Sequence, residues 1–393
     1  MDTARNPYSP GAGLRPPALV GRDAEIAKVR ALVSRATNRR SIARGLVLSG
    51  LRGVGKTVLL NELASVAEDN GWIVGRVEAR RKGAGEPLDV LLARSLRSSL
   101  RKASRRYAAT EKVKSALSSF KSFSLGLDPS GSLSLGIDVA PQRGRADNHD
   151  LAADLVELAE DLGDAAKEQG AATALFVDEM QDADLTVLRA LIGAAHEAAQ
   201  MDRPFYVFGA GLPSLPGHLA DAVTYTERLF EYRTIEHLTE YDSRIALTEP
   251  AEREGVQWDG DAALTIVRES AGYPYFLQEY GRAAWDAAIG PATITQSDVL
   301  VAVTEGRGAL DAGFFRGRWN RATPAERDYL RAMAADGAGP SSSSDIAARL
   351  GRPLTSLGPA RANLIAKGLI YSPEHGRIAY TVPGMADFVD RQH

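Results

Sequence analysis

The 393-residue sequence contains no cysteine, which excludes disulfide bonds and metal sites built on thiolates. It has no stretch approaching the ~20 consecutive apolar residues that a membrane-spanning helix needs. Residues 1–17 are rich in proline, glycine and polar side chains and lack the apolar segment of a signal peptide. The formal net charge of -3 shows no excess of one sign, so any nucleic-acid site must be local. We therefore expect a soluble, cytoplasmic protein with no membrane partner, preceded by a disordered tail over 1–17.

The most specific motif lies at residues 50–57, which read G-L-R-G-V-G-K-T and fit the phosphate-binding loop G-x-x-x-x-G-K-[ST]. An apolar run at 46–48 precedes it and a helical pattern follows, which is the strand–loop–helix context that the motif requires. The glycines let backbone N–H groups approach a β-phosphate, and the helix N-terminus adds partial positive charge. The expected nucleotide contacts are Gly50, Gly53, Val54, Gly55, Lys56, Thr57 and Val58.

Two residues of this loop have assigned chemistry. We expect the Lys56 ammonium to reach the β- and γ-phosphates and the Thr57 hydroxyl to ligate Mg²⁺.

A second apolar run, residues 174–177, ends in Asp178 and Glu179, as a Walker B strand does. Such a strand brings its last residues to the carboxyl edge of a parallel sheet, where nucleotides bind. Asp178 would then hold Mg²⁺, and Glu179 would polarise the attacking water.

These motifs together predict an α/β P-loop fold that binds ATP and Mg²⁺ and hydrolyses ATP. The acidic pair argues against a small-molecule kinase, because a kinase transfers phosphate to a substrate hydroxyl and has less use for a water-polarising carboxylate.

The segment before the P-loop, L-V-G-R-D-A-E-I-A-K-V-R-A-L-V at 19–33, resembles the corresponding segment of AAA+ and related STAND ATPases. In those families it lies beside the adenine base, which implies adenine contacts from Val20, Gly21 and Arg22. Residues 272–274, Gly-Tyr-Pro, resemble the lid motif of STAND ATPases and of the origin-recognition initiator ATPases. In that motif the proline packs on the nucleotide, which implies the same role for Pro274.

The resemblance implies an AAA+-like core over 18–240, with helices on both faces of a parallel sheet, and an α-helical lid over 241–320. It also implies an arginine that meets the γ-phosphate in cis or from a neighbouring subunit. Arg228 is the first candidate and Arg233 the second. The alternative for Arg228 is a surface ion pair with Glu227 or Glu231.

One position departs from the AAA+ pattern. The strand expected at 205–208 leads to the sensor 1 position, which usually carries a polar side chain that points at the γ-phosphate. Here Gly209 and Ala210 have none, and Ser214 offers the nearest hydroxyl.

Residues 321–393 predict helices followed by a hairpin, the pattern of a winged helix-turn-helix. The segment L-I-A-K-G-L-I-Y-S-P-E-H-G-R-I-A-Y-T-V-P-G-M-A-D-F-V at 364–389 resembles the end of bacterial ATPases of this type. The expected contacts to duplex DNA are Ser356, Arg361, Asn363, Lys367 and Arg377. Because some winged helices bind protein and this one has few positive charges, a protein partner is the alternative.

Residues 80–150 read as an insertion into the core. Basic residues at three- and four-residue spacing share one helical face, which is either a phosphate-binding stripe or a solvated helix face: Arg94, Arg97, Arg101 and Arg105. Alternating apolar and small residues on both sides of a Pro-Ser-Gly turn predict a β-hairpin at 123–137.

The leading hypothesis is an ATPase whose nucleotide state is coupled to DNA binding through the winged helix. The rival is a slowly hydrolysing, STAND-like regulatory switch whose winged helix binds a protein. A transposition-type ATPase that acts on a partner recombinase is a third alternative. A homo-oligomer or another protein is an expected partner in each case.

Overall fold

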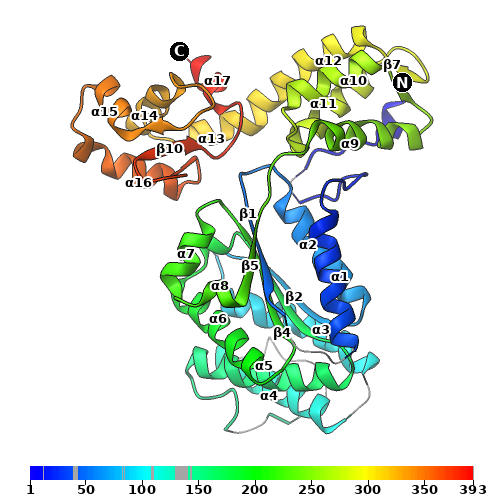
Figure 1. The fold of residues 1–393 in the computed structure, drawn as a ribbon, viewed down its shortest axis with the longest axis vertical. Coiled ribbons are helices and arrows are strands. Elements are labelled where there is room, and N and C mark those ends of the chain that lie inside the picture. Colours follow the sequence, from blue (N-terminus) through cyan, green and yellow to red (C-terminus); the bar gives the residue numbers. More distant parts are fainter. Residues whose placement is uncertain are drawn as a thin grey trace. The chain divides into compact units, whose positions relative to one another are not determined.

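The computed structural model describes residues 1–11, 13–38, 43–81, 83, 85–107, 110–128, 140–141 and 144–392. The chain forms two compact units. The first comprises Met1–Gly21, Gly50–Gly55 and Ile235–His393, and the second comprises Arg22–Ser49 and Lys56–Thr234. Figure 1 labels the helices and strands of each. Within the described ranges, every helix is too short or too polar to cross a membrane.

The second unit is built on a parallel sheet whose described strands run in the order β2-β3-β4-β1-β5. Strands β1 and β4 are buried at every position, and β3 is buried at all but its last residue. A strand that is covered on both faces has a continuous apolar sequence, and for this reason these strands could be predicted from the sequence. The sheet confirms the expected α/β P-loop core. The strands are β1 (Gly45–Ser49), β2 (Ile73–Glu78), β3 (Thr173–Asp178), β4 (Phe205–Gly211) and β5 (Phe230–Thr234).

Helices cover both faces of this sheet, as Figure 1 shows. Helix α1 (Asp23–Thr37) packs on α2 (Lys56–Asp69), which lies against β2, β3 and β4. Helices α5 (Leu151–Glu168) and α6 (Leu185–Gln200) pack on each other and on the sheet. Short helical segments follow the strand ends: η2 (Met180–Asp182), α7 (Leu215–Ala222) and α8 (Thr226–Leu229).

The insertion between β2 and β3 contains α3 (Leu88–Arg106), which packs on β2, and α4 (Glu111–Leu127), which packs on α5. The β-hairpin predicted at 123–137 is wrong at its start, because residues 123–127 close helix α4. Phe120 and Phe123, three residues apart, bury their rings on one helical face, and Ser119 donates to Asp161 of α5. Residues 129–139 of the predicted hairpin lie outside the described residues.

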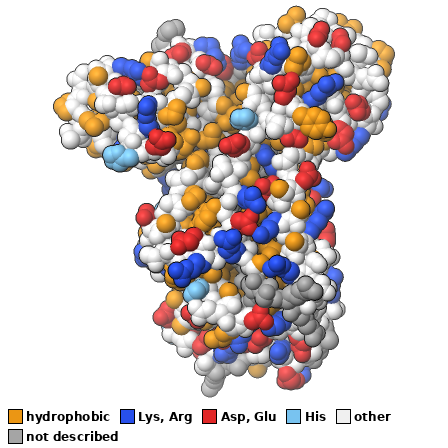
Figure 2. All heavy atoms as spheres, viewed as in Figure 1, with side chains coloured by type: hydrophobic (Ala, Val, Ile, Leu, Met, Phe, Trp, Pro, Cys, Tyr) orange, Lys and Arg blue, Asp and Glu red, His pale blue; other side chains and the backbone are white. Residues whose placement is uncertain are grey.

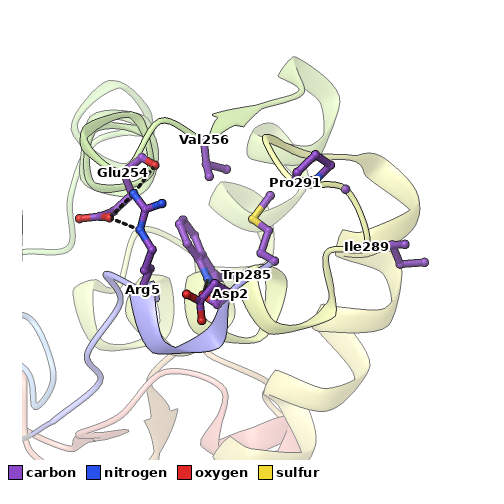
Figure 3. A pocket seen from close by; sticks show the side chains of 9 residues that line it. Asp2, Arg5, Glu254, Val256, Trp285, Ile289 and Pro291 are labelled. Carbon is purple, nitrogen blue, oxygen red and sulfur yellow. Dashed lines mark hydrogen bonds and ion pairs between the residues drawn. The ribbon is translucent and has the colours of Figure 1, made fainter.

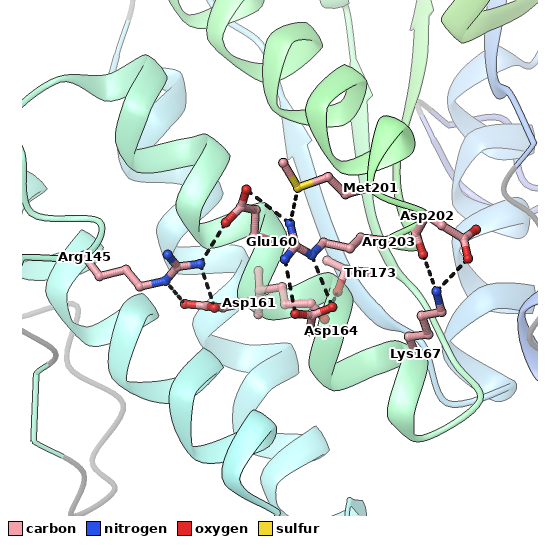
Figure 4. Close-up of polar contacts among 10 residues, drawn as sticks. Arg145, Glu160, Asp161, Asp164, Lys167, Thr173, Met201, Asp202 and Arg203 are labelled. Carbon is pink, nitrogen blue, oxygen red and sulfur yellow. Dashed lines mark hydrogen bonds and ion pairs between the residues drawn. The ribbon is translucent and has the colours of Figure 1, made fainter.

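Helix α5 is held by arginines from two directions (Figure 4). Arg145, from the end of the insertion, pairs with Asp161 (Nε–Oδ2 2.7 Å) and Glu160 (Nη2–Oε2 2.9 Å). Arg203, just before β4, pairs with Glu160 (3.1 Å) and Asp164 (3.2 Å). The hydrogen bond with Asp161 is the main reason that the pKa of Arg145 is raised above its ordinary value. This network fixes α5 relative to the end of the insertion and to the segment that enters β4.

Over the range where the sequence predicted a lid, the first unit forms helices that begin at well-defined caps. The Thr239 side chain accepts from the Asp242 N–H at the start of α9, and Thr295 with Asp298 forms a capping box at α12. Strand β6 (Gln257–Trp258) pairs with β7 (Thr293–Ile294). The helices are α9 (Glu240–Arg253), α10 (Gly260–Ser270), α11 (Pro274–Ala287), α12 (Gln296–Ala309), the π-helical η3 (Leu310–Phe315) and α13 (Arg316–Asn320).

An aromatic cluster spans η3, the lid and the C-terminal region. Phe314 stacks on Tyr275 of α11 with ring centroids 4.9 Å apart. Phe315 lies 6.0 Å from Phe276 of α11 and stacks on Phe388 at 5.4 Å. The rings therefore join helices on either side of residue 320 into one core.

The N-terminal residues pack on the lid, which corrects the expectation of a disordered tail over 1–17. The Tyr8 ring is 3% exposed, its hydroxyl donates to the Leu247 carbonyl, and the Trp258 indole N–H donates to that hydroxyl (2.9 Å). The Trp285 indole N–H donates to the Asp2 carbonyl (2.9 Å). Figure 3 shows the adjoining pocket and the ion pair between Arg5 and Glu254, whose Nη2 and Oε2 atoms lie 2.9 Å apart. The pocket is lined by Met1, Asp2, Arg5, Glu254, Val256, Trp285, Ile289, Gly290 and Pro291.

The C-terminal region has helices and a hairpin at the positions that the sequence predicted. Its described strands form an antiparallel sheet in the order β8-β10-β9. Leu330, Ile346, Leu364 and Ile378 are fully buried and form its core with Phe388. The elements are α14 (Pro324–Ala334), β8 (Ser341–Ser342), α15 (Ser343–Leu350), η4 (Leu354–Leu357), α16 (Gly358–Ala366), β9 (Ile370–Tyr371), β10 (Arg377–Tyr380) and α17 (Met385–Asp390).

Candidate active site

The loop between β1 and α2 has a backbone that requires its glycines. Gly53 and Gly55 adopt φ values of +88° and +92°, which side chains disfavour. A Cβ at Gly50 would collide with the carbonyl of Ile235. Helix α2 begins directly after this loop, at Lys56. The predicted P-loop therefore has a backbone that depends on glycine and a helix N-terminus, both of which suit a phosphate group.

Thr57 and Asp178 meet at the start of α2 and the end of β3. The Thr57 hydroxyl donates to Asp178 Oδ2 at 2.6 Å, and the Glu179 N–H donates to Oδ1 at 2.9 Å. Burial raises the pKa of Asp178, while the Thr57 hydrogen bond and the Lys56 charge oppose that rise. Lys56 itself is 9% exposed. The structure thus brings together three of the residues predicted from the two motifs.

The Thr57 hydroxyl and the Asp178 carboxylate are suited to hold a magnesium ion together with a phosphate group. A hydroxyl and a carboxylate are hard oxygen donors, which Mg²⁺ prefers. The described residues contain no cluster of three or more His, Cys, Asp or Glu side chains able to hold a metal alone. A Mg²⁺ ion at Thr57 and Asp178 would therefore complete its octahedron with phosphate oxygens and water.

Glu179 stands at a sharp backbone turn. Its φ of +46° and ψ of +40° are left-handed values that cost a non-glycine residue about 1–3 kcal/mol. The strand β3 ends there and η2 begins at the next residue. Its carboxylate Oε2 accepts a hydrogen bond from Gln181 Nε2 at 2.6 Å.

Gln181 is a site residue that the sequence reasoning missed. Its amide also accepts, through Oε1, the backbone N–H of Leu212 at the end of β4 (3.1 Å). The glycines of β4 make room for η2, because a Cβ at Gly209 would strike the Met180 sulfur and one at Gly211 would strike Gln181 Oε1. The signal that was available was a glycine at alternate positions of the strand, 209 and 211, which face the same side.

The sensor 1 position therefore has no polar side chain of its own, as the sequence indicated. The polar group at this end of β4 comes instead from η2. Ser214, the nearest hydroxyl in the sequence, is exposed and precedes α7.

The two candidate arginine fingers differ in their surroundings. Arg228 lies exposed in α8, and within the described residues its side chain forms no hydrogen bond or ion pair. Arg233 pairs with Glu231 at 2.7 Å. Glu231 also holds Lys28 at 2.5 Å, so the surface ion pair considered for Arg228 is not formed with this carboxylate. The comparison favours Arg228 as a cation available to another molecule.

A glycine with a positive φ lies in the segment expected near adenine, and another lies in the lid motif. Gly21 has a φ of +68°, and a Cβ there would lie 2.9 Å from an Asp242 carboxylate oxygen. Val20 is half-buried, and Arg22 precedes helix α1. The role of these three residues beside the adenine base stays a prediction.

In the lid motif, Gly272 has a φ of +74° and its carbonyl accepts the Leu238 N–H at 2.8 Å. Pro274 occupies the first turn of α11, as expected of a helix start. Tyr273 lies beside the P-loop residue Gly53: a Cβ atom added at Gly53 would lie 3.9 Å from Cδ1 of the tyrosine ring. The lid motif and the front of the P-loop are thus neighbours within the first unit.

The side chains expected to contact DNA differ in how far they are buried. The Lys367 ammonium pairs at 2.5 Å with Glu326, which is 2% exposed, and Arg361 is half-buried with Nη2 3.4 Å from Ser372 Oγ. Ser356, Asn363 and Arg377 are exposed. Ser356 Oγ donates to the Pro353 carbonyl at 2.7 Å, and Arg377 Nη1 donates to the Pro340 carbonyl at 3.3 Å. On the face drawn in Figure 2, basic and acidic side chains are interspersed.

Comparisons with known proteins agree with this geometry. Residues 18–208 match the family model of the AAA ATPase domain, and residues 312–389 match a domain of unknown function, DUF8462. A search of curated proteins finds no match. A Walker-type ATPase of Pyrococcus abyssi is similar in structure, with a TM-score of 0.60 at 16% identity over 96% of this chain and 97% of that chain.

Two further solved structures align more distantly. The RuvB Holliday junction branch migration motor of Thermotoga maritima has a TM-score of 0.46 at 16% identity, over 94% of this chain and 96% of that chain. The Orc1 protein of Aeropyrum pernix, in complex with DNA, has a TM-score of 0.45 at 16% identity, over 96% and 94% of the two chains.

The family match covers the P-loop, the Walker B strand and strands β1 to β3, which carry the Thr57–Asp178 pair. Residues 18–208 are therefore an AAA ATPase domain with a P-loop, and the chain shares the fold of a Walker-type ATPase.

Proposed function

We propose that the chain binds ATP with Mg²⁺ and hydrolyses it to ADP and phosphate. The observation that carries this proposal is the 2.6 Å contact between the Thr57 hydroxyl and Asp178, residues 121 positions apart in the chain. A buried lysine stands beside Thr57 and a carboxylate follows Asp178, which supports the proposal because phosphoryl transfer to water requires groups of these kinds.

Each side chain has a defined role in this reaction. The Lys56 ammonium neutralises charge on the β- and γ-phosphates, and Thr57 and Asp178 hold Mg²⁺, which, when bound, offsets the charge of the phosphate oxygens. Glu179 accepts a hydrogen bond from the attacking water and orients it toward the γ-phosphorus. Arg228 of a neighbouring copy in a homo-oligomer supplies a further positive charge in the transition state.

The test is steady-state ATP hydrolysis by the full chain and by Glu179→Gln, with and without duplex DNA. We expect the variant to bind ATP as tightly as the wild type and to lose turnover. Glu197→Gln, a half-buried glutamate of α6, is the matched control and should keep wild-type turnover. Full turnover by Glu179→Gln would reject Glu179 as the residue that polarises the attacking water.

We further propose that the C-terminal region is a winged helix that couples nucleotide state to duplex DNA. In this proposal α16 is the recognition helix and the β9–β10 hairpin is the wing, and both carry exposed polar residues, Asn363 and Arg377. Arg377→Ala should weaken duplex binding and reduce its salt dependence, because a lost phosphate contact releases fewer counterions. Arg244→Ala, an exposed arginine of the lid, is the control.

A regulatory switch is the second candidate, and one contact favours it. The Arg52 backbone N–H in the P-loop donates to the Thr381 carbonyl of the C-terminal region at 3.1 Å, inside the first unit. A shift of the loop backbone on nucleotide binding would thus act directly on that region. Tight ATP binding, negligible turnover with and without DNA, and no salt-sensitive duplex binding would select the switch, with a protein as the partner.

A further inference from the structure

A single side-chain amide joins the water-polarising carboxylate to the end of a neighbouring strand. Gln181 Nε2 donates to Glu179 Oε2 at 2.6 Å, and Gln181 Oε1 accepts the Leu212 N–H at 3.1 Å. The orientation of the amide is fixed by these partners, because a backbone N–H must face the oxygen and a carboxylate must face the nitrogen. The amide nitrogen of Gln181 therefore donates one hydrogen bond and its amide oxygen accepts one.

Strand β4 has a glycine, Gly211, where the Gln181 amide packs against it. Gly211 is the last residue of β4, and a Cβ there would overlap Gln181 Oε1 and lie 2.9 Å from Leu215 Cδ2. Gly211 does not have a positive φ, so its backbone does not require glycine. The space taken by the Gln181 amide is the physical reason for a glycine at this position.

The carboxylate itself sits on a backbone that needs such support. Glu179 holds left-handed φ and ψ values, and residues in that region persist only where their surroundings determine them. A hydrogen bond to a charged group is shorter and stronger than one between neutral groups, which is enough to select one carboxylate orientation. The bond from Gln181 can therefore fix both the turn and the carboxylate.

We propose that Gln181 is a positioning residue for ATP hydrolysis, which holds the Glu179 carboxylate in the orientation that activates water and ties it to the end of β4. Gln181 of η2 thus supplies a polar side chain at the end of β4, where Gly209 and Ala210 supply none. A change at the end of β4 would reach the reacting water through this amide. The inference rests on the proposed ATPase activity and identifies a residue that sets its rate.

The first test replaces the amide but keeps its size. Gln181→Met in the full chain should lower kcat by roughly 10- to 100-fold, the effect of losing one hydrogen bond to a charged group, with little change in KM or ATP affinity. A residue that only packs would tolerate methionine, because the two side chains have similar length and volume. An unchanged or higher kcat overturns the proposal.

The second test disturbs the same contact from the strand. Gly211→Ala should lower kcat in the wild type, because the methyl group displaces the amide, and should have little further effect in Gln181→Ala, where no amide remains. Gly217→Ala in α7, where a Cβ meets nothing within 4 Å, is the matched control. Independent, additive losses from Gly211→Ala and Gln181→Ala would contradict the shared contact.

Glu179→Gln separates the failure of this inference from the failure of the proposed function. Absence of ATP hydrolysis by the wild type rejects the proposed ATPase activity itself, and full turnover by Glu179→Gln rejects Glu179 as the residue that polarises the water. Turnover that is lost in Glu179→Gln but retained in Gln181→Met rejects only the positioning role. Thermal unfolding of every variant, with a midpoint matching the wild type, confirms that the rates compare folded proteins.

Discussion

Replacing Lys367 separates a structural role from a DNA contact in the C-terminal region. Its ammonium lies 2.5 Å from Glu326 Oε2, and the Glu326 side chain is almost fully inaccessible to water. The same carboxylate caps α14 by accepting the Thr323 N–H at 2.8 Å. Lys367→Met keeps most of the aliphatic chain and removes the charge, which leaves a buried carboxylate with one partner fewer.

The size of the effect follows from this geometry. Removing one partner of a buried ion pair costs about 3–5 kcal/mol, because the other charge is left in a poor solvent. We expect about 3 kcal/mol, the lower end, because the Lys367 side chain is 29% exposed and the Thr323 hydrogen bond remains. That free energy corresponds to an increase on the order of 100-fold in local opening of α14 and β9.

The assay is amide hydrogen exchange, read by mass spectrometry on peptides from α14 and β9 in the full chain. Lys367→Arg should preserve protection, and the double variant Lys367→Met/Glu326→Gln should recover most of it because no buried charge remains. Wild-type protection in Lys367→Met would refute the reasoning. Loss of duplex binding in Lys367→Met without loss of protection would return Lys367 to the list of DNA contacts.

The same pair gives the C-terminal region an acid sensitivity of known sign. Burial alone would raise the pKa of Glu326, but hydrogen bonds from Lys367 and Thr323 outweigh it and hold the pKa below the ordinary 4.5. A depressed folded-state pKa contributes stability that is fully present above that ordinary value and is lost as the pH falls through the folded value. Protection of α14 should therefore decline below about pH 4.5 in the wild type.

Three further outcomes are expected. If Arg228 acts in trans, mixing Arg228→Ala with Glu179→Gln should restore part of the turnover that each lacks alone, whereas no restoration would place Arg228 in cis or outside catalysis. Tyr8→Phe should destabilise the first unit by about 1–3 kcal/mol in denaturant unfolding, because the hydroxyl that bonds the Leu247 carbonyl is lost, and an unchanged midpoint would contradict that role. Asp178→Asn should weaken Mg²⁺-dependent ATP binding while leaving metal-free binding similar, and equal losses with and without Mg²⁺ would remove Asp178 from the metal site.

The nucleotide-site motifs were readable because their geometry is local. The P-loop conformation depends on glycines that lie within the six positions 50–55. Strand β3 is recognisable in the sequence as an apolar run that ends in two acidic residues. Their meeting at Thr57 and Asp178 follows from a parallel sheet, in which strand ends share one edge.

The features that sequence reasoning missed depend on distant partners. Gln181 has no local signature, because its second partner is a backbone N–H on another strand. Tyr8 lies in a composition typical of a tail, yet its ring and hydroxyl are satisfied by residues more than two hundred positions away. The start of the predicted hairpin became helix because Phe120 and Phe123 fit a period of 3.6 residues once α5 provides a surface to bury them.

The aromatic cluster at η3 sets where this chain can be divided. Cutting near residue 320, where the helical pattern of the lid ends, would take Phe388 away from Phe315 and leave rings exposed on both fragments. Expressed separately, the lid and the C-terminal region would therefore be prone to aggregation, whereas a fragment that spans residues 235–392 would retain the cluster whole. For the same reason, the two regions should melt as one cooperative transition, and a calorimetric scan should not resolve them.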